Sequence, residues 1–286
     1  MHEQEQHYKS REVSTYMFKR AQAWWYVSIL LRLFVFISGI IGVWIAQWRL
    51  PMTIVAGILT VISAIFVWRS EELRSISDSL KRRDEGQDWF GWQITREELS
   101  NILQQLPSKF AQDLSLTEAN RNYYDSEMPP GSIRALECVQ ESAWWSKEQA
   151  RRLSNICFGI TVIFLAICII VLFGVGIIEL DSDTRLQVSR VVLGVFTFIA
   201  SLGFAPLAMK YRKFCDKAGE IEMTASNILK MSDSGLQNNP IPAIKLMHDY
   251  QLARVGAPLL PTILYNQLRN HLNSIWIQYR RDKLQH

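Results

Sequence analysis

The stretch ICFGITVIFLAICIIVLFGVGII, residues 156–178, decides the fold of this chain. Its side chains are apolar or small throughout, and none of them is charged. At about 1.5 Å of rise per residue, a helix of this length reaches the roughly 30 Å thickness of a bilayer core. A helix of this size in a water-soluble protein would show a polar face, which this stretch lacks. The stretch therefore predicts a membrane-spanning helix.

The charges at the two ends of this stretch predict its orientation. Arg151 and Arg152 stand just before it, whereas the acidic Glu179, Asp181 and Asp183 follow it. Because the cytoplasmic ends of spans carry an excess of Lys and Arg, the N-terminal end of this span is expected in the cytoplasm.

Three more apolar stretches extend the membrane part, at residues 24–48, 51–68 and 188–209. Tryptophans stand at both ends of the first one, as in the aromatic belts of membrane interfaces. Few residues separate the first stretch from the second, so these two are expected to form a tight helical hairpin. We therefore predict an all-α membrane protein with four transmembrane helices in two hairpins and helical cytoplasmic extensions.

Polarity divides the chain into five segments, and both termini are expected in the cytoplasm. The segments are a cytoplasmic N-terminal segment (1–22), a first transmembrane hairpin (23–69), a cytoplasmic helical region (70–152), a second transmembrane hairpin (153–210) and a cytoplasmic C-terminal helical region (211–286).

Helical patterns continue outside the apolar stretches. Apolar residues at helical spacing over 70–84 predict that the second span extends into the cytoplasm as an amphipathic helix. Thr95 and Glu98 form a capping box that predicts a helix over 95–106. After the break at Pro129–Gly131, a helix from Ser132 is expected to run uninterrupted into the third span. Further helices are expected over 211–231 and over 242–281, the last one broken around Pro258 and Pro261.

Composition limits the classes of function. The chain has 286 residues, a hydrophobic content of 49% and a formal charge of +4. Its basic residues cluster beside the spans, which indicates topology signals and lipid head-group contacts, so no nucleic-acid polymer is expected as a partner. The four cysteines form no CxxC pair and predict no disulfide framework.

Signatures of catalysis are missing from the sequence. It contains no HExxH motif, no paired His/Cys spacing, no phosphate-binding glycine loop and no GxSxG motif. His248 and Asp249 are adjacent, but neighbours on a helix point to different sides. We therefore expect no catalytic residue, no metal site and no cofactor, and a protein that is not an enzyme.

Two intramembrane features are candidate functional groups. Arg32 lies inside the first span, where a charge is either functional or reaches the head groups by snorkelling. Ser38, Gly42 and Ala46 form a ridge of small residues at four-residue spacing, which serves either packing within the chain or an oligomer interface.

Short motifs outside the spans carry a resemblance to a known family. The residues involved are Asp88, Trp89, Trp92, Tyr124, Gln140, Trp145, Arg152, Asp249, Arg254, Pro261, Tyr265 and Arg269. They resemble motifs of the SMODS-associating four-transmembrane effector family, pore-forming effectors of bacterial cyclic-oligonucleotide antiphage systems. The sequence departs from the family pattern at Asp125, which stands where the family has a proline.

The resemblance implies an effector in the bacterial inner membrane that disrupts the bilayer after a cytoplasmic signal. The implied signal is a cyclic oligonucleotide made by a partner nucleotidyltransferase, and the implied assembly is a homo-oligomer. Arg82, Arg83, Arg134 and Arg212 are candidates to meet its phosphates. Two alternatives stay open: a non-conducting membrane scaffold or regulatory subunit, and a purely structural role for the motif residues in ion pairs and helix packing.

Overall fold

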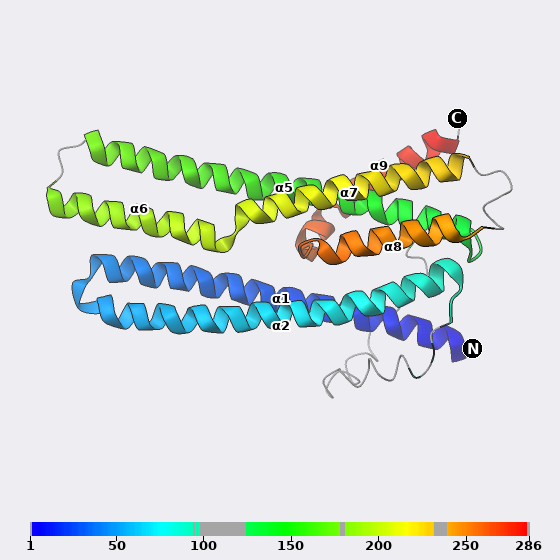
Figure 1. The fold of residues 1–286 in the computed structure, drawn as a ribbon, viewed down its shortest axis with the longest axis horizontal. Helices are drawn as coiled ribbons and strands as arrows, with labels where there is room; N and C mark the ends of the chain where they lie inside the picture. The colour runs from blue at the N-terminus through cyan, green and yellow to red at the C-terminus, as the bar shows by residue number, and fades with distance from the viewer. Residues whose placement is uncertain are drawn as a thin grey trace. The chain divides into compact units, whose positions relative to one another are not determined.

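The computed structural model describes residues 2–93, 95, 97, 124–177, 181–231 and 239–284. These residues form α-helices and one short 3₁₀ helix, and no strand occurs among them. In chain order the elements are α1 (His2–Trp44), η1 (Ala46–Trp48), α2 (Arg49–Phe90), α5 (Ser132–Ile177), α6 (Ser182–Leu202), α7 (Phe204–Lys230), α8 (Ile241–Gly256) and α9 (Thr262–Leu284), as drawn in Figure 1. The predicted all-α class is confirmed.

Three of the described helices are long and apolar enough to cross a membrane. The candidate segments are Arg11–Trp44, Arg49–Phe90 and Ser132–Gly174, which overlap the first three predicted spans. The predicted fourth span, 188–209, is not an unbroken helix, because α6 ends at Leu202 and α7 begins at Phe204. Gly203 between them has φ +67°, a left-handed conformation that ends a helix and that glycine adopts without strain.

The predicted helical extensions of the second and third spans are confirmed. α2 is one helix of 42 residues, and Pro51 is tolerated because it lies in the first turn. α5 is one helix of 46 residues that begins at Ser132, directly after Gly131. The predicted break near the C-terminus lies between α8 and α9. The helix predicted over 95–106 lies almost wholly outside the described residues.

The chain forms two compact units. The first consists of Met1–Lys19, Arg74–Arg152 and Tyr211–His286, and we call it the core unit. The second consists of Arg20–Leu73 and Leu153–Lys210, and we call it the apolar unit. Residues of α1, α2, α5 and α7 contribute to both units.

The core unit has an apolar interior of the kind found in water-soluble proteins. Trp89, Leu136 and Val139 are fully buried there, and Ile221 and Tyr250 pack into the same cluster. These residues come from α2, α5, α7 and α8, so four helices share one core. Burial of such side chains stabilises the unit by about 1.5–3 kcal/mol each.

The apolar unit has the opposite distribution of side chains. Most of the exposed large apolar residues of the described chain lie in it, among them Ile58 at 54% exposure and Phe173 at 69%. Several serines of its helices are buried instead, with Ser28, Ser63 and Ser70 at most 3% exposed. Large apolar side chains outside and small polar ones inside suit a lipid surround, because helices in lipid associate through small and hydrogen-bonding residues.

Hydrogen bonds hold α1 against α2 in the apolar unit. Ser63 Oγ donates to the carbonyl of Ser28 at 3.1 Å, and Ser70 Oγ donates to the carbonyl of Ala21 at 2.7 Å. The rings of Trp24 and Phe66 stack with centroids 4.9 Å apart. α1 and α2 therefore lie side by side along the apolar unit (Figure 1).

Candidate functional site

A buried ion pair joins α2 to α8 within the core unit. Arg254 of α8 donates from Nη1 to Oε1 of Glu85, and from Nη2 to Oε2 at 3.1 Å. Gln251, one turn earlier on α8, donates to the same Oε2 at 3.2 Å. Glu85 is 1% exposed and Arg254 is 9% exposed. Such burial of charge is tolerable because the two-pronged geometry satisfies both carboxylate oxygens.

The pair keeps both groups charged at neutral pH. Burial alone would raise the pKa of the Glu85 carboxyl, but the charge of Arg254, the nearby charge of Lys81 and two hydrogen bonds lower it below its usual 4.5. Burial would lower the pKa of Arg254, and the charge of Glu85 reverses this and raises it. The ion pair therefore stabilises the charged form of both groups.

Arg74 of α2 closes the C-terminal end of α8. Its Nη2 donates to the carbonyl oxygens of Arg254 and Ala257, at 3.1 and 2.6 Å. Carbonyls at the end of a helix lack partners within the helix, and a cation there also meets the negative end of the helix dipole. α2 consequently holds α8 twice, once by the buried pair and once by this cap.

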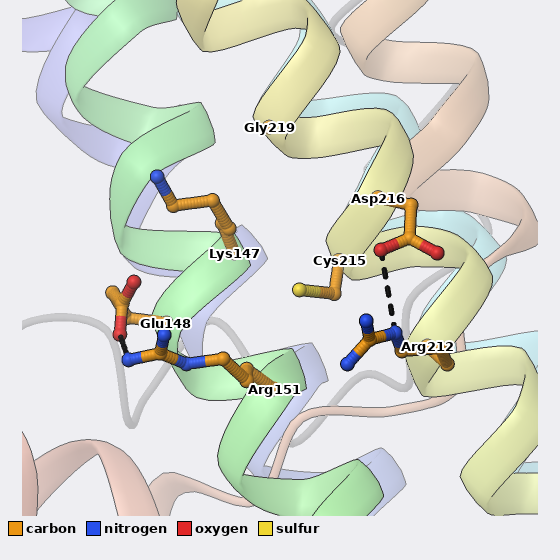
Figure 2. Close-up of a pocket in the computed structure, with 7 residues that line it drawn as sticks. All are labelled: Lys147, Glu148, Arg151, Arg212, Cys215, Asp216 and Gly219. Carbon is orange, nitrogen blue, oxygen red and sulfur yellow. Dashed lines mark hydrogen bonds and ion pairs between the residues drawn. The ribbon is translucent and has the colours of Figure 1, made fainter.

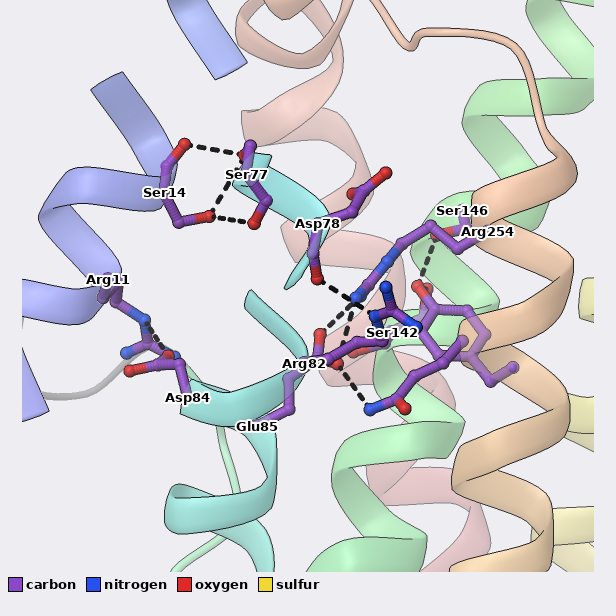
Figure 3. Close-up of polar contacts among 12 residues, drawn as sticks. Arg11, Ser14, Ser77, Asp78, Arg82, Asp84, Glu85, Ser142, Ser146 and Arg254 are labelled. Carbon is purple, nitrogen blue, oxygen red and sulfur yellow. Dashed lines mark hydrogen bonds and ion pairs between the residues drawn. The ribbon is translucent and has the colours of Figure 1, made fainter. Parts of the chain in front are cut away.

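The N-terminal part of α1 packs on the same stretch of α2. Ser14 and Ser77 exchange hydrogen bonds, each hydroxyl donating to the other residue's carbonyl, at 3.0 and 2.8 Å. Arg11 Nε lies 3.0 Å from Asp84 Oδ2. Figure 3 shows these contacts and those of Arg254, so that residues 77–85 of α2 carry partners on two sides.

A second charged contact fixes the segment that precedes α5. Arg134 donates to Oδ1 and to the carbonyl of Asp88, both at 2.9 Å. It also donates to the carbonyls of Ser126 and Met128, both at 2.9 Å. With four acceptors already in place, Arg134 is unsuited to the role of phosphate ligand that its charge suggested.

Aromatic side chains form a second cluster in the core unit. Trp144 and Trp276 are buried in it, with ring centroids 5.2 Å apart. Trp145 packs on Tyr265 of α9 at 5.9 Å. Aromatic contacts of this geometry stabilise helix packing by about 0.5–1.5 kcal/mol beyond the area that they bury. This cluster joins α5 to α9.

Lys147 connects α5 to α7 through an ion pair with Glu222. Its Nζ lies 2.6 Å from Glu222 Oε2, and the other oxygen of Glu222 accepts a hydrogen bond from Tyr279 at 2.8 Å. Burial, followed by the Glu222 carboxylate, raises the pKa of Tyr279. A Cβ at Gly219 would lie 3.3 Å from Lys147 Cδ, so glycine there lets the lysine stem pass close to α7.

A hollow of about 400 Å³ opens between α5 and α7 in the core unit. Three cationic side chains line it together with two carboxylates, a thiol and a glycine: Lys147, Glu148, Arg151, Arg212, Cys215, Asp216 and Gly219. Figure 2 shows Arg151 on α5, Arg212 on α7 and the thiol of Cys215 pointing from α7 toward α5. Burial and the carboxylates of Asp216 and Glu148 raise the pKa of this thiol, whereas both arginines act to lower it, so charges of both signs act inside the hollow.

The motif residues divide into three groups. Trp89, Tyr124 and Gln140 are buried, with the rings of Trp89 and Tyr124 in contact at 5.7 Å. Contacts already described engage Asp88, Trp145, Arg254 and Tyr265, and Trp92 stacks on Phe90 at 4.9 Å. The rest do not join these contacts: Asp249 makes no ion pair within the described residues, Arg269 is exposed, Arg152 is half-buried, and the carbonyl of Pro261 accepts hydrogen bonds at the start of α9.

Two of the intramembrane candidates, Arg32 and Gly42, lie against α2. Arg32 Nε lies 3.4 Å from Ser63 Oγ. Ser38 is buried, and a Cβ at Gly42 would lie 3.5 Å from Met52 Cβ, so the ridge packs within the chain at this point. Ala46 lies in η1. Arg32 therefore has a partner inside the apolar unit.

Sequence patterns alone did not identify Glu85. It stands among many charged residues of an amphipathic helix, and its burial depends on Arg254, 169 positions away. No three His, Cys, Asp or Glu side chains gather to hold a metal ion in the part of the chain that the structure describes. Comparisons with protein-family models, curated proteins and solved structures find no match to this chain.

Proposed function

We propose that this protein is a multi-pass effector of the bacterial inner membrane that permeabilises the bilayer when its cytoplasmic part receives a signal. One observation carries the membrane placement: the apolar unit exposes Ile, Leu and Phe and buries serine. Water would penalise that arrangement at about 25 cal/mol per Å² of exposed apolar surface, whereas lipid does not.

The proposed topology has four spans in two hairpins, with both termini in the cytoplasm. The first three spans follow from α1, α2 and α5, and the fourth from residues 188–209, bent at Gly203. Arg151 and Arg152 on α5, and Arg212 and Lys213 on α7, give the core unit the positive flanks expected of a cytoplasmic part.

Signal transfer is proposed to use the helices that belong to both units. α2 and α5 are single helices without a break, so a shift of their ends in the core unit would move their apolar parts as well. The proposed signal, from the family resemblance, is a cyclic oligonucleotide from a partner nucleotidyltransferase. Because no apolar helix carries a continuous polar face in the described part of the chain, conduction is proposed to need association of several copies.

Dye leakage from liposomes tests this function. Purified full-length protein is reconstituted, and leakage is measured with a panel of cyclic di- and trinucleotides and without any. Leakage that requires one nucleotide is the expected result and names the signal. Leakage without any nucleotide would indicate a pore that a partner, missing from the liposomes, normally holds shut. Ligand gating would then be rejected.

Absence of leakage from folded, inserted protein would overturn the effector proposal. The non-conducting scaffold or regulatory subunit would then be the better explanation. A variant that opens the buried pair, Arg254→Met, serves as an internal comparison. Nucleotide-dependent leakage should change in this variant, whereas Lys217→Gln, which removes an exposed ion pair with Glu220, should leave it unchanged.

A further inference from the structure

The hollow between α5 and α7 combines exposed arginines with unused hydrogen-bond donors. Arg151 pairs with Glu148 three residues before it, and Arg212 Nε lies 3.4 Å from Asp216 Oδ1. The two guanidinium side chains are 55% and 61% exposed. Neither makes any other hydrogen bond or ion pair within the described residues, so most of their N–H groups have no protein acceptor.

Asp216 is the weaker of the two carboxylate competitors for an incoming anion, since Glu148 is only 13% exposed. Asp216 is 62% exposed, and ion pairs at such exposure are worth little because water and salt screen them. A phosphate offers several acceptor oxygens to a guanidinium fork at once, which a monodentate contact with one carboxylate oxygen does not. Exchange of Asp216 for a phosphate at Arg212 is therefore favourable, whereas Arg151 can keep Glu148 and offer its remaining N–H groups.

The position of these arginines in the chain indicates where the phosphate comes from. Arg151 is two residues before Leu153 on α5, where the apolar unit begins, and Arg212 is two residues after Lys210 on α7, where it ends. Arg152 and Lys213 stand next to them and add positive charge. Basic pockets at the cytoplasmic ends of membrane helices attract anionic head groups.

The lining residues favour a head group over a soluble nucleotide. None of the seven is aromatic, so the hollow has no ring on which a base could stack. A volume of about 400 Å³ is sufficient for a glycerophosphate group. We propose that this hollow binds the phosphate of an anionic phospholipid head group, with Arg151 and Arg212 as its ligands. The proposal rests on the membrane placement in the proposed function, but not on pore formation.

Lipid binding by the full-length protein in a neutral detergent tests the proposal. Native mass spectrometry would measure the affinity for short-chain phosphatidylglycerol and for phosphatidylcholine of the same chain length. Phosphatidylglycerol should bind more tightly, and the double variant R151Q/R212Q should lose about thirtyfold in affinity, because each cation near a lipid surface contributes about fivefold. The Asp216→Asn variant should bind more tightly, since it removes the competing carboxylate.

Lys217→Gln is the matched control. Lys217 lies on the same helix in an exposed pair with Glu220 and does not line the hollow, so its loss should change affinity less than twofold. An equal loss of affinity in Lys217→Gln and R151Q/R212Q would show that the lipid binds through the general positive charge of the surface. The proposed site would then be rejected. Unchanged melting temperatures of the variants would show that they fold.

The experiment also distinguishes the phosphate of a lipid head group from the phosphate of a soluble molecule. Inorganic phosphate and a cyclic dinucleotide are added as competitors at equal concentration. If either binds in an Arg151- and Arg212-dependent way while phosphatidylglycerol binds no better than phosphatidylcholine, the lipid proposal is overturned. Because no leakage is measured, a negative leakage result leaves this outcome unaffected, and the two proposals can fail separately.

Discussion

The core unit and the apolar unit use the same helices in opposite ways. In the core unit α2 buries Leu80 and Trp89 and pairs its buried Glu85 with Arg254. In the apolar unit the same helix exposes Ile58 and buries Ser63. The kind of side chain that α2 buries thus changes along its length, from serine in the apolar unit to Leu and Trp in the core unit. This change indicates that the two ends of the helix are adapted to different solvents.

The comparison also shows which contacts hold the helices together in each unit. In the apolar unit, packing rests on small residues and serine hydroxyls, whose individual hydrogen bonds are worth about 0.6 kcal/mol in membranes. In the core unit a single buried ion pair with a cap fixes α8 on α2. The core unit is therefore expected to lose more stability than the apolar unit when one polar contact is removed.

The largest expected effect comes from the buried pair. Arg254→Met leaves the carboxylate of Glu85 buried without its counter-charge and should destabilise the core unit by about 3–5 kcal/mol. The double variant E85L/R254M removes both charges and should recover most of the loss. Denaturant unfolding followed by tryptophan fluorescence measures both. If the double variant is as unstable as the single one, the loss of apolar packing rather than the unpaired charge is the cause.

A charge on the outer surface of the apolar unit should have the next largest effect. Ile163 on α5 is 60% exposed, and Ile163→Asp should cost about 2.5–3.5 kcal/mol in membrane insertion if lipid surrounds it. Ile241 in the core unit is 69% exposed, so Ile241→Asp should cost little. Carbonate-resistant membrane association of the two variants compares them. Equal membrane insertion of the two variants would contradict the assignment of different surroundings to the two units.

A smaller effect is expected at the contact between α1 and α2. Gly42→Leu places a large side chain against Met52 and Arg49 and should destabilise the apolar unit by about 1–3 kcal/mol. Gly57 has open space where its Cβ would be, so Gly57→Leu should be nearly neutral. Melting temperature in detergent is the measurement. A larger loss at Gly57 would indicate that its surface is covered by another copy of the chain.

The sequence predicted the helices well because length and apolar content identify them locally. The start of α5 at Ser132 and the break before α9 follow from Pro and Gly, whose effects act over a few residues. The interruption at Gly203 was missed, because a single glycine in an apolar run is compatible with a continuous helix and only the surrounding structure selects φ +67°.

The candidate site was less accessible to sequence reasoning. Arg254 was singled out, but its partner Glu85 was not, since a contact across 169 positions leaves no local pattern. The hollow likewise depends on two helices, α5 and α7, that bring Arg151 and Arg212 to one place. Charge and periodicity identify helix faces, whereas the partners across an interface depend on the tertiary fold.

The smallest expected effect is a pH dependence confined to the core unit. Glu85 lies beyond the apolar part of α2, and its folded pKa is below 4.5 because of Arg254. A carboxyl group with a lowered folded pKa binds fewer protons than the unfolded chain does, so its contribution to stability is complete above about pH 4.5 and is lost as the pH falls through the folded value. Unfolding free energies of the wild type and of E85L/R254M, measured from pH 6 down to about pH 3, isolate this contribution. The wild type should lose more stability than the double variant over that range, because only the wild type retains the paired carboxylate. Parallel curves would show that the acid sensitivity of the core unit does not arise from the paired carboxylate of Glu85.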